Sequence, residues 1–408
     1  MRDRARGCSP WRRAALAAVL AAVCLLTAGC WDRVEIQDRA FVLAVAVDVA
    51  EEGADKEPGK AKVESYAHPA PPDRYRVTFQ VLRFGEAKGG QDRPGGGGGR
   101  TFLVTGRGPT MLDAVRDALG ESSKGLWFEN LQVLIFSQKV AERYGLAPVV
   151  DFYRRDAEMR GRAQIYITPG EAAKLLAITP PSGEPGGVFL ANVARRYPKD
   201  IHLPIARTDI SFASLALDNR ADMMFPVLEA AGETMKAKGG ALFKGDKFLG
   251  YQDEYFIRGV RIIRATEKSA AISFECPTHP GSATTFELFR HQTILKPHVA
   301  GERVWFTLEI AMRGNLDEIQ CGHQHDTLDA AYLGKAQKRA ADEVERNIRH
   351  TLAVSQKLGW EMFYFKQSLQ AYKPKDWERI KDRWEEIYST APVEVKVRVS
   401  IIGVGEHK

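Results

Sequence analysis

The chain has 408 residues, of which 44% are hydrophobic and 27% are charged, a composition typical of a globular protein with two or three domains. Its formal net charge is +6, but residues 1–29 contain five arginines and one aspartate and contribute +4 of that total. The rest of the chain therefore carries only +2 and lacks the basic surface that nucleic-acid binding requires. No later stretch of the sequence reaches the length of a transmembrane helix.

The first 29 residues have the layout of a secretory signal peptide. Arginines precede an uncharged stretch from Ala14 to Ala28, which is shorter than the roughly 20 apolar residues that span a bilayer. The small residue Gly29 precedes Cys30, so we expect cleavage between Gly29 and Cys30 and lipidation of the Cys30 thiol. Stable anchoring requires two acyl chains, which such a modification supplies. The alternative is a plain secreted protein in which Cys30 follows the cut by chance.

The segment that follows carries a resemblance to a known family. Cys30-Trp31-Asp32-Arg33-Val34-Glu35-Ile36, followed by the apolar run from Ala40 to Val47, resembles the mature start of the Ger(x)C family. These proteins are the lipoprotein C subunits of nutrient germinant receptors of spores. Four later segments match the family in the same order: Gly106-Arg107-Gly108 with Thr110 and the helix after it, the block Val149–Arg160, the Gly245-Asp246 region and the C-terminal stretch from Pro374.

The resemblance implies a non-enzymatic subunit with an α+β fold in two or three domains. It implies a lipid-anchored protein on the outer face of the cell membrane, and in a spore on the inner membrane. The implied partners are the integral-membrane A- and B-type receptor subunits, and the implied role is nutrient-triggered spore germination. It implies nothing about which germinant acts or whether this chain contacts a small-molecule germinant.

In the first half of the chain, alternating and continuous apolar runs predict strands at the following ranges: 41–47, 75–84, 101–105, 126–128, 131–136 and 164–168. Thr110 is expected to cap a helix with Asp113 three residues later. Further helices are expected at 138–144 and from Gly170 to Ala177. The glycine run 95–99 precedes no Gly-Lys-Ser/Thr sequence, so we interpret it as a hairpin loop and not as a phosphate-binding loop.

The block Val149–Arg160 contains three arginines and three acids within ten residues. Their spacing allows i, i+3 and i+4 pairs, which predicts a salt-bridged structural corner. A partner-binding face is the alternative interpretation.

In the second half, a hairpin is predicted around Gly245-Asp246, followed by strands at 257–264, 270–275, 284–295 and 302–312 in an antiparallel meander. A long helix is predicted from Asp326 to Leu358, because its apolar residues recur at three- and four-residue steps. We expect that stripe to pack on a sheet and not in a coiled coil. Pro374 opens a last helix, and Val393–Ile401 alternates as a terminal strand. These elements predict an α+β fold with mixed or antiparallel sheets, packed helices, and a terminal helix and strand.

The double glycine at 239–240 is the expected domain boundary. It divides the chain into a signal peptide at 1–29, an N-terminal Ger(x)C-like domain at 30–238 and a C-terminal Ger(x)C-like domain at 239–408. The last of these has a further candidate division near 300–320.

The cysteines raise two questions: whether Cys276 and Cys321 form a disulfide, and whether Cys321 binds a metal. Cys276 and Cys321 are able to form a disulfide outside the cytoplasm, but they are equally compatible with two buried thiols. Cys321, His323 and His325 are the weak candidates for metal ligands. A structural zinc site has four ligands, and no second pair of ligands has a suitable spacing. We therefore expect no metal and no cofactor.

No nucleophile elbow, zincin helix or P-loop occurs in the sequence, so no catalytic residue is predicted. The alternative function is an extracytoplasmic solute-binding lipoprotein of a transport system. Such proteins alternate strands and helices in two lobes, whereas here a meander of strands leads into a long helix.

Overall fold

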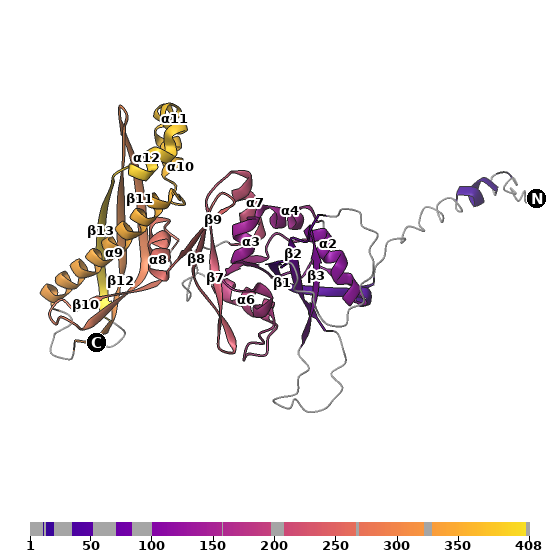
Figure 1. The fold of residues 1–408 in the computed structure, drawn as a ribbon. Helices are drawn as coiled ribbons and strands as arrows, with labels where there is room; N and C mark the ends of the chain where they lie inside the picture. Colours follow the sequence, from indigo (N-terminus) through magenta and orange to yellow (C-terminus); the bar gives the residue numbers. More distant parts are fainter. Residues whose placement is uncertain are drawn as a thin grey trace, which may run out of the picture. The chain divides into compact units, whose positions relative to one another are not determined.

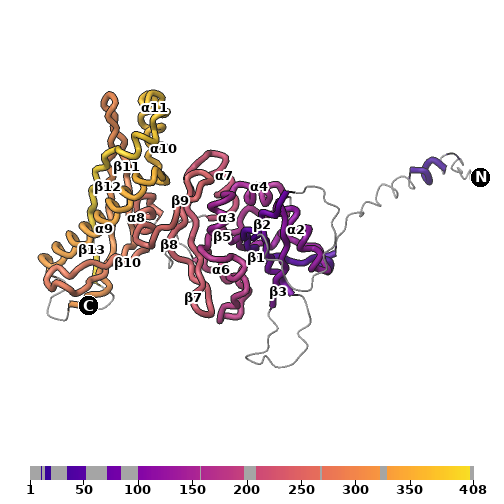
Figure 2. Tube along the Cα trace, in the orientation of Figure 1, coloured from indigo at the N-terminus to yellow at the C-terminus, as the bar shows by residue number. Residues whose placement is uncertain are grey.

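The computed structural model describes residues 11, 14–19, 35–51, 71–83, 100–156, 158–196, 208–266, 269–321 and 329–404. The chain divides into two compact units, Met1–Arg39 and Ala40–Lys408. In the first unit, a short 3-10 helix, η1 (Ile36–Asp38), directly precedes strand β1. The elements that follow belong to the second unit (Figures 1 and 2).

A mixed sheet of nine strands forms the first part of the second unit. Its order is β3-β2-β1-β5-β6-β7-β8-β9, and β4 pairs with β1 beside this path. Strands β1, β5, β6 and β7 are parallel neighbours, while β2 and β3 at one side and β8 and β9 at the other are antiparallel additions. The strand bounds are β1 Arg39–Val49, β2 Tyr75–Leu82, β3 Thr101–Gly108, β4 Gly125–Trp127, β5 Val133–Ser137, β6 Gln164–Thr168, β7 Met223–Ala231, β8 Thr234–Lys244 and β9 Lys247–Gln252.

Strand β1 is apolar from Ala40 to Val47, in keeping with a sheet that is covered on both faces. Val45 and Val47 belong to one hydrophobic cluster, whereas Ala44 and Ala46 belong to another on the opposite face. Residues that alternate along a strand point to opposite faces. The continuous apolar run therefore serves two cores at once, as expected for a central parallel strand.

Helices cover both faces of this sheet. Four of them contribute to the larger cluster: α2 (Met111–Ala118), α3 (Gln138–Arg143), α4 (Ala147–Arg155) and α7 (Ile210–Asp218). Two cover the opposite face: α5 (Ala172–Leu176) and α6 (Gly186–Arg195). A 3-10 turn, η2 (Leu119–Glu121), follows α2. The side chain of Thr110 accepts a hydrogen bond from the Asp113 amide, which confirms the predicted cap.

A second sheet of four strands has the order β10-β11-β12-β13. Strands β10, β11 and β12 are antiparallel, and β13 is parallel to β12. The bounds are β10 Ala270–Glu275, β11 Ala283–Ala300, β12 Arg303–Ile319 and β13 Val393–Val404. The helices of this part are α8 Glu254–Ile263, α9 Ala330–Leu358, α10 Phe365–Tyr372, α11 Pro374–Ile380 and α12 Trp384–Thr390, with η3 at Lys381–Arg383.

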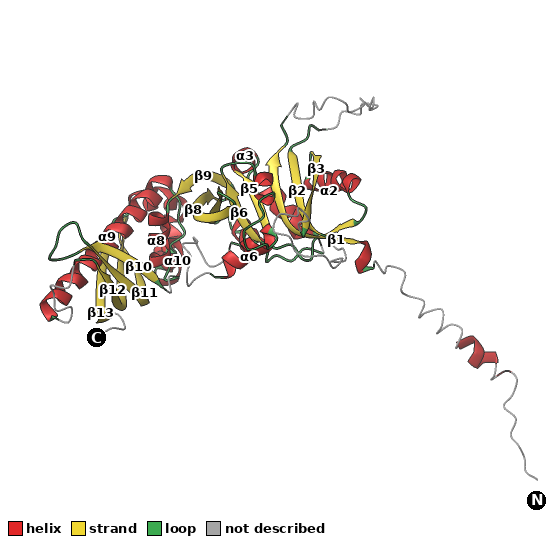
Figure 3. Cartoon of the chain, turned by 90° about the horizontal axis from the view of Figure 1, so that it is seen from below, coloured by secondary structure: helices red, strands yellow, loops and turns green. Residues whose placement is uncertain are grey.

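The long helix α9 runs along one face of the second sheet (Figures 1 and 3). Its stripe of Ala336, Ala340, Val344, Ile348 and Leu352 is buried in one cluster with the inward side chains of strands β10–β13. This confirms the prediction that the stripe packs on a sheet. The α+β class, the mixed and antiparallel sheets and the terminal helix and strand are also confirmed.

One predicted strand is wrong. Of the predicted strand 257–264, residues 257–263 form part of helix α8 and Arg264 is its C-cap, although Val260, Ile262 and Ile263 suggested a strand. The Asp253 side chain accepts a hydrogen bond from the Phe256 amide and starts the helix, because it satisfies a donor that has no partner within the helix. Local capping therefore outweighs β-branched composition.

Helix α6 was not predicted, because Gly186 and Gly187 open it and glycine is a poor helix former. Gly187 is required by packing, since a Cβ there would lie 2.8 Å from the Ala44 Cβ. No helix within the described ranges is long and apolar enough to cross a membrane.

Candidate functional site

A groove of about 600 Å³ opens where strands β7, β8 and β9 meet the start of helix α8. It lies close to the predicted domain boundary, and its lining residues come from both sides of that boundary. They are Val227, Glu229, Lys236, Lys238, Gly239, Tyr251, Gln252, Asp253, Glu254 and Tyr255.

The groove combines opposed charges with a phenol. Lys238 Nζ lies 2.8 Å from Glu229 Oε2 across β7 and β8, and this hydrogen bond raises the pKa of Lys238. The hydroxyl of Tyr251 is buried without a hydrogen-bond partner among the described residues, and burial raises its pKa. None of the lining residues is histidine, cysteine or serine. The groove can therefore hold polar groups, and its lining contains no nucleophile and base of the Ser–His or Cys–His kind.

Two carboxyl groups lie close together between the residue preceding β7 and the loop after α9. Asp222 Oδ2 accepts a 2.5 Å hydrogen bond from the Glu361 amide, while Glu361 Oε1 accepts from the amides of Phe363 and Phe365 at 2.7 and 3.2 Å. Burial raises the pKa of Asp222 to about 6. Burial also raises the pKa of Glu361, and the nearby Asp222 charge adds to this rise. This pair is a protonation-sensitive contact between distant segments.

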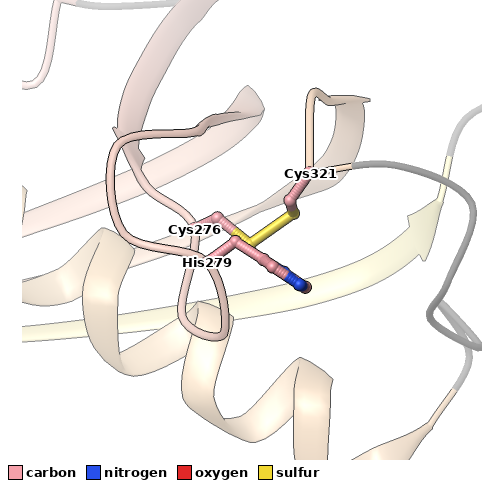
Figure 4. A group of neighbouring side chains, drawn as sticks. All are labelled: Cys276, His279 and Cys321. Atoms are coloured by element: carbon pink, nitrogen blue, oxygen red, sulfur yellow. A yellow bond between two sulfur atoms is a disulfide. The ribbon is translucent and has the colours of Figure 1, made fainter.

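A disulfide joins Cys276, which follows β10, to Cys321, which follows β12 (Figure 4). The Cα atoms are 6.6 Å apart, within the range of ordinary disulfides. Figure 4 shows the ring of His279 beside the bond, and the three ligating atoms lie within 4.8 Å of one another. Both sulfurs are used by the disulfide, so neither is a thiolate able to bind a metal.

The structure describes only one of the site residues predicted from the sequence, Cys321. Gly29, Cys30, His323 and His325 lie outside the described residues. Cys321 is buried and pairs with Cys276. The question of a disulfide or two thiols, which the sequence left open, is therefore answered in favour of the disulfide.

The charged block around α4 forms ion pairs with its neighbours. Arg155 Nε lies 2.7 Å from Asp151 Oδ2, one turn earlier on α4, and Arg154 Nη1 lies 2.7 Å from Asp218 Oδ1 on α7. Arg160 pairs with Glu129. Two of these three arginines therefore bind acids outside the block, which supports the interpretation as a structural corner.

Three acids with structural roles were missed by sequence reasoning: Asp222, Glu361 and Asp246. Asp246 was named only as a turn residue, but its carboxylate accepts hydrogen bonds from the amides of Leu146 and Ala147. The amides bound by Asp246 lie 99 and 100 residues away, and the Glu361 amide bound by Asp222 lies 139 residues away. No local pattern in a single sequence marks such contacts.

Comparison with known proteins first defines the class. The model described as "Spore germination protein N-terminal domain" matches residues 32–230, and "Spore germination B3/GerAC like, C-terminal" matches residues 238–405. The two matches occur in order and together span nearly the whole chain. The protein is therefore of the spore germination class.

The chain belongs to the GerAC-like family, whose members are the non-catalytic C subunits of germinant receptors. It is similar to the spore germination protein YndF of Bacillus subtilis (strain 168), with 22% identity over 95% of this chain and 96% of the relative. The putative spore germination protein YfkR of the same organism is 25% identical over 93% of this chain and 94% of its own length. Spore germination protein KC is 22% identical over 97% and 96%.

A solved structure supports the fold. The crystal structure of the GerBC protein matches with a TM-score of 0.56 and 17% identity, covering 80% of this chain and 93% of that protein. The architecture described above is thus a GerBC-like fold.

Proposed function

We propose that this germinant-receptor component is anchored by lipid at Cys30 to the outer face of the membrane, and in the spore to the inner membrane. There it assembles with the integral-membrane A- and B-type subunits and is required for nutrient-triggered germination. Its contribution is assembly and positioning within the receptor, without catalysis.

The observation that carries this proposal is the ordered match of both family regions, at residues 32–230 and 238–405. The relatives match over nearly their full length, which supports the same domain organisation in this chain. The same match favours the receptor over the solute-binding lipoprotein. It also supports the proposed division into an N-terminal domain ending near 238 and a C-terminal domain from 239.

The anchor is supported by the distance along the chain between Cys30 and the fold. Strand β1 begins at Arg39, nine positions after Cys30. Nine residue steps span at most about 30 Å when fully extended. A diacylated Cys30 would therefore hold the folded unit close to the membrane surface, where integral-membrane subunits are within reach.

Membrane fractionation of Cys30→Ser tests the anchor. The variant is expected to leave the membrane fraction for the soluble fraction, because two acyl chains supply the attachment. The matched control is Cys24→Ser, which lies in the segment expected to be removed. Retention of Cys30→Ser in membranes, at the wild-type level and with the signal peptide cleaved, would contradict lipid anchoring.

An immunoblot across vegetative membranes and the inner membranes of dormant spores tests the receptor assignment at the cellular level. Confinement to the spore fraction and a germination defect after deletion are expected. Abundance in vegetative membranes with normal germination of the deletion strain would contradict the proposed role.

A further inference from the structure

The second sheet has one face covered by helix α9 and one face that no described element covers (Figure 3). Because side chains alternate along a strand, the register places Arg290, Arg313 and Arg398 together on this outer face. All three side chains are exposed. The outer face therefore presents a basic cluster, defined here as these three arginines.

The arrangement of the basic cluster follows from strand pairing. Arg290 on β11 lies directly opposite Arg313 on β12, and Arg398 on β13 lies opposite Ala311, two residues from Arg313. Ser400 is opposite Arg313. Ala311 and Ser400, together with Gln292 opposite Ala311, form the floor of the cluster. Like charges directly opposite on neighbouring strands are destabilising, so this cluster costs stability in the isolated chain.

Other cations on the same face have acids to neutralise them. Lys296 Nζ lies 2.7 Å from Glu309 Oε1, and Lys396 Nζ lies 3.0 Å from Glu394 Oε1. Within the described parts of the chain, no ion pair involves an arginine of the basic cluster. The hydrogen bond from Lys296 lowers the pKa of Glu309, and the charge of Arg398 also acts on Glu309 and adds to this lowering. Arg290 and Arg313 are therefore the members of the cluster whose charge remains available to a partner.

A β-bulge adds an aromatic side chain to the cluster. The pairing passes from Leu288 opposite Gly314 to Arg290 opposite Arg313, which leaves Phe289 as an extra residue. Phe289 is 47% exposed. Bulges re-aim side chains and are frequent next to functional sites. A Cβ at Gly314 would lie 2.8 Å from the Glu287 carbonyl carbon, so the close approach of the strands here requires glycine.

We propose that the basic cluster and Phe289 form a docking surface for an acidic segment of a partner protein. Arginine forks bind carboxylates in a bidentate manner, and the ring of Phe289 supplies an apolar contact beside them. The inference goes beyond the proposed function, and it rests on that function only in assigning the acidic segment to another receptor subunit.

The surrounding charges favour a protein over an anionic membrane. Glu309 and Glu394 lie on one side of the cluster, and Glu287 and Asp317 on the other. Glu309 and Glu394 are paired with Lys296 and Lys396, so Glu287 and Asp317 are the acids that would repel a uniformly negative lipid surface. An acidic segment of limited length can instead meet the arginines alone.

Site-directed cross-linking tests the surface in native membranes. Ala311→Cys places a thiol on the floor of the cluster, and Ala331→Cys places one on the exposed start of α9. Each variant is labelled with a thiol-reactive benzophenone and irradiated, and the cross-linked peptides are identified by mass spectrometry. The natural Cys276–Cys321 disulfide does not react.

We expect Ala311→Cys to cross-link to an Asp- or Glu-rich segment of an integral-membrane receptor subunit. Adding Arg290→Gln, Arg313→Gln and Arg398→Gln should reduce that yield about tenfold or more, because charge complementarity holds the segment. The matched control, Lys335→Gln with Lys338→Gln and Arg339→Gln, removes the same charge from the exposed face of α9 and should leave the yield unchanged.

Cross-links to lipid, cross-links to a second copy, or no cross-link at all from Ala311→Cys would overturn the inference. So would a yield that the arginine substitutions do not reduce. The fractionation of Cys30→Ser tests the proposed function separately. If Cys30→Ser leaves the membrane but the cross-linking gives one of these outcomes, the proposed function stands and only the docking surface is contradicted.

Discussion

The indole Nε1 of Trp360 donates a 3.2 Å hydrogen bond to the main-chain carbonyl of Met223, 137 residues earlier. Trp360 follows α9 and Met223 opens β7, so this bond joins the end of the long helix to the nine-stranded sheet. Trp360 is fully buried and its ring contacts those of Phe256 and Phe363. The Trp360 side chain therefore packs against two aromatic rings and also hydrogen-bonds to the nine-stranded sheet.

Trp360→Phe should lower the free energy of unfolding by about 1–2 kcal/mol, because it removes the donor and part of the buried ring while keeping an aromatic side chain. Urea denaturation of the purified chain measures this. The control is Trp377→Phe, a buried tryptophan whose indole makes no hydrogen bond within the described residues. An equal loss in both variants would show that the Trp360–Met223 bond contributes nothing beyond packing.

Asp222→Asn should change the dependence of stability on pH. The pKa of Asp222 is raised to about 6 in the folded chain, from 3.8 in the unfolded chain. Between these values the folded state binds more protons, so the free energy of unfolding of the wild type falls as pH rises from about 4 to 6. Asparagine keeps the oxygen that accepts from the Glu361 amide but cannot ionise. The free energy of unfolding of the variant, relative to that of the wild type, should therefore rise by about 1–3 kcal/mol between pH 4 and pH 7.

The measurement is urea denaturation at a series of pH values, with the exposed Asp382→Asn as the control. Glu361 also has a raised pKa, so the wild-type curve contains a second contribution of the same sign, and the variant loses only the part of it that the Asp222 charge adds. Parallel curves for wild type and Asp222→Asn would show that this carboxyl does not titrate differently on folding.

These two contacts show what the sequence could not predict. The strands, the α9 stripe and the terminal strand follow from periodicities of two and 3.6 residues that are visible within each segment. Trp360 and Asp222 belong to no such pattern, because their partners are more than a hundred residues away. The basic cluster is intermediate: alternation put Arg398 on the polar face of its strand, but only the register of β11, β12 and β13 shows that Arg290 and Arg313 lie beside it.

The error at α8 has a local cause. The last four residues of α8, Val260 to Ile263, include three β-branched side chains, and such side chains favour strands. Phe256, Ile257, Val260 and Ile263 nevertheless recur at helical spacing, and Asp253 provides the cap. Giving the cap and the spacing more weight than composition would have identified the helix.

Two glycines on neighbouring helices should respond in opposite ways to alanine. A Cβ at Gly259 on α8 would lie 2.8 Å from the Thr351 Cβ on α9, whereas nothing lies within 4 Å of a Cβ at Gly334. Gly259→Ala should cost about 1–3 kcal/mol because two packed helices must separate. Gly334→Ala should stabilise by about 0.5–1 kcal/mol because alanine loses less backbone entropy in a helix.

Thermal or urea denaturation of both variants checks this pair, and each serves as the control for the other. Stabilisation by Gly259→Ala would mean that α8 and α9 approach less closely than described, and destabilisation by Gly334→Ala would mean that its position is covered.

Removal of the disulfide should destabilise the chain without abolishing the fold. Cys276 and Cys321 are separated by 45 residues and join the ends of β10 and β12. Closing a loop of that length in the unfolded state stabilises the fold by about 2–4 kcal/mol in the chain-entropy model. The double variant Cys276→Ser with Cys321→Ser should show this loss in urea denaturation.

Reductant provides the internal control for the disulfide. It should lower the stability of the wild type to that of the double variant and leave the double variant unchanged. A wild type that is insensitive to reductant under conditions in which its thiols become titratable would contradict a stabilising role of the bond.

Asp246→Ala should loosen the start of helix α4, although Asp246 lies in the β8–β9 turn. Its Oδ1 accepts hydrogen bonds from the amides of Leu146 at 2.6 Å and Ala147 at 2.8 Å. Neither Leu146 nor another residue of α4 provides a side-chain cap of its own. The turn of a later hairpin thus caps an earlier helix, and substitution should cost about 1–2 kcal/mol, as for other N-caps.

Amide hydrogen exchange separates this cap from a general loss of stability. Asp246→Ala should expose the Leu146 and Ala147 amides selectively, while Asp246→Asn retains an oxygen acceptor and should preserve most of their protection. Because the acid and the amides lie 99 residues or more apart in the chain, selective exchange would also show that the later hairpin stabilises the earlier helix through this contact. Uniform loss of protection across α4 and the hairpin would instead mean that Asp246 acts on the fold as a whole.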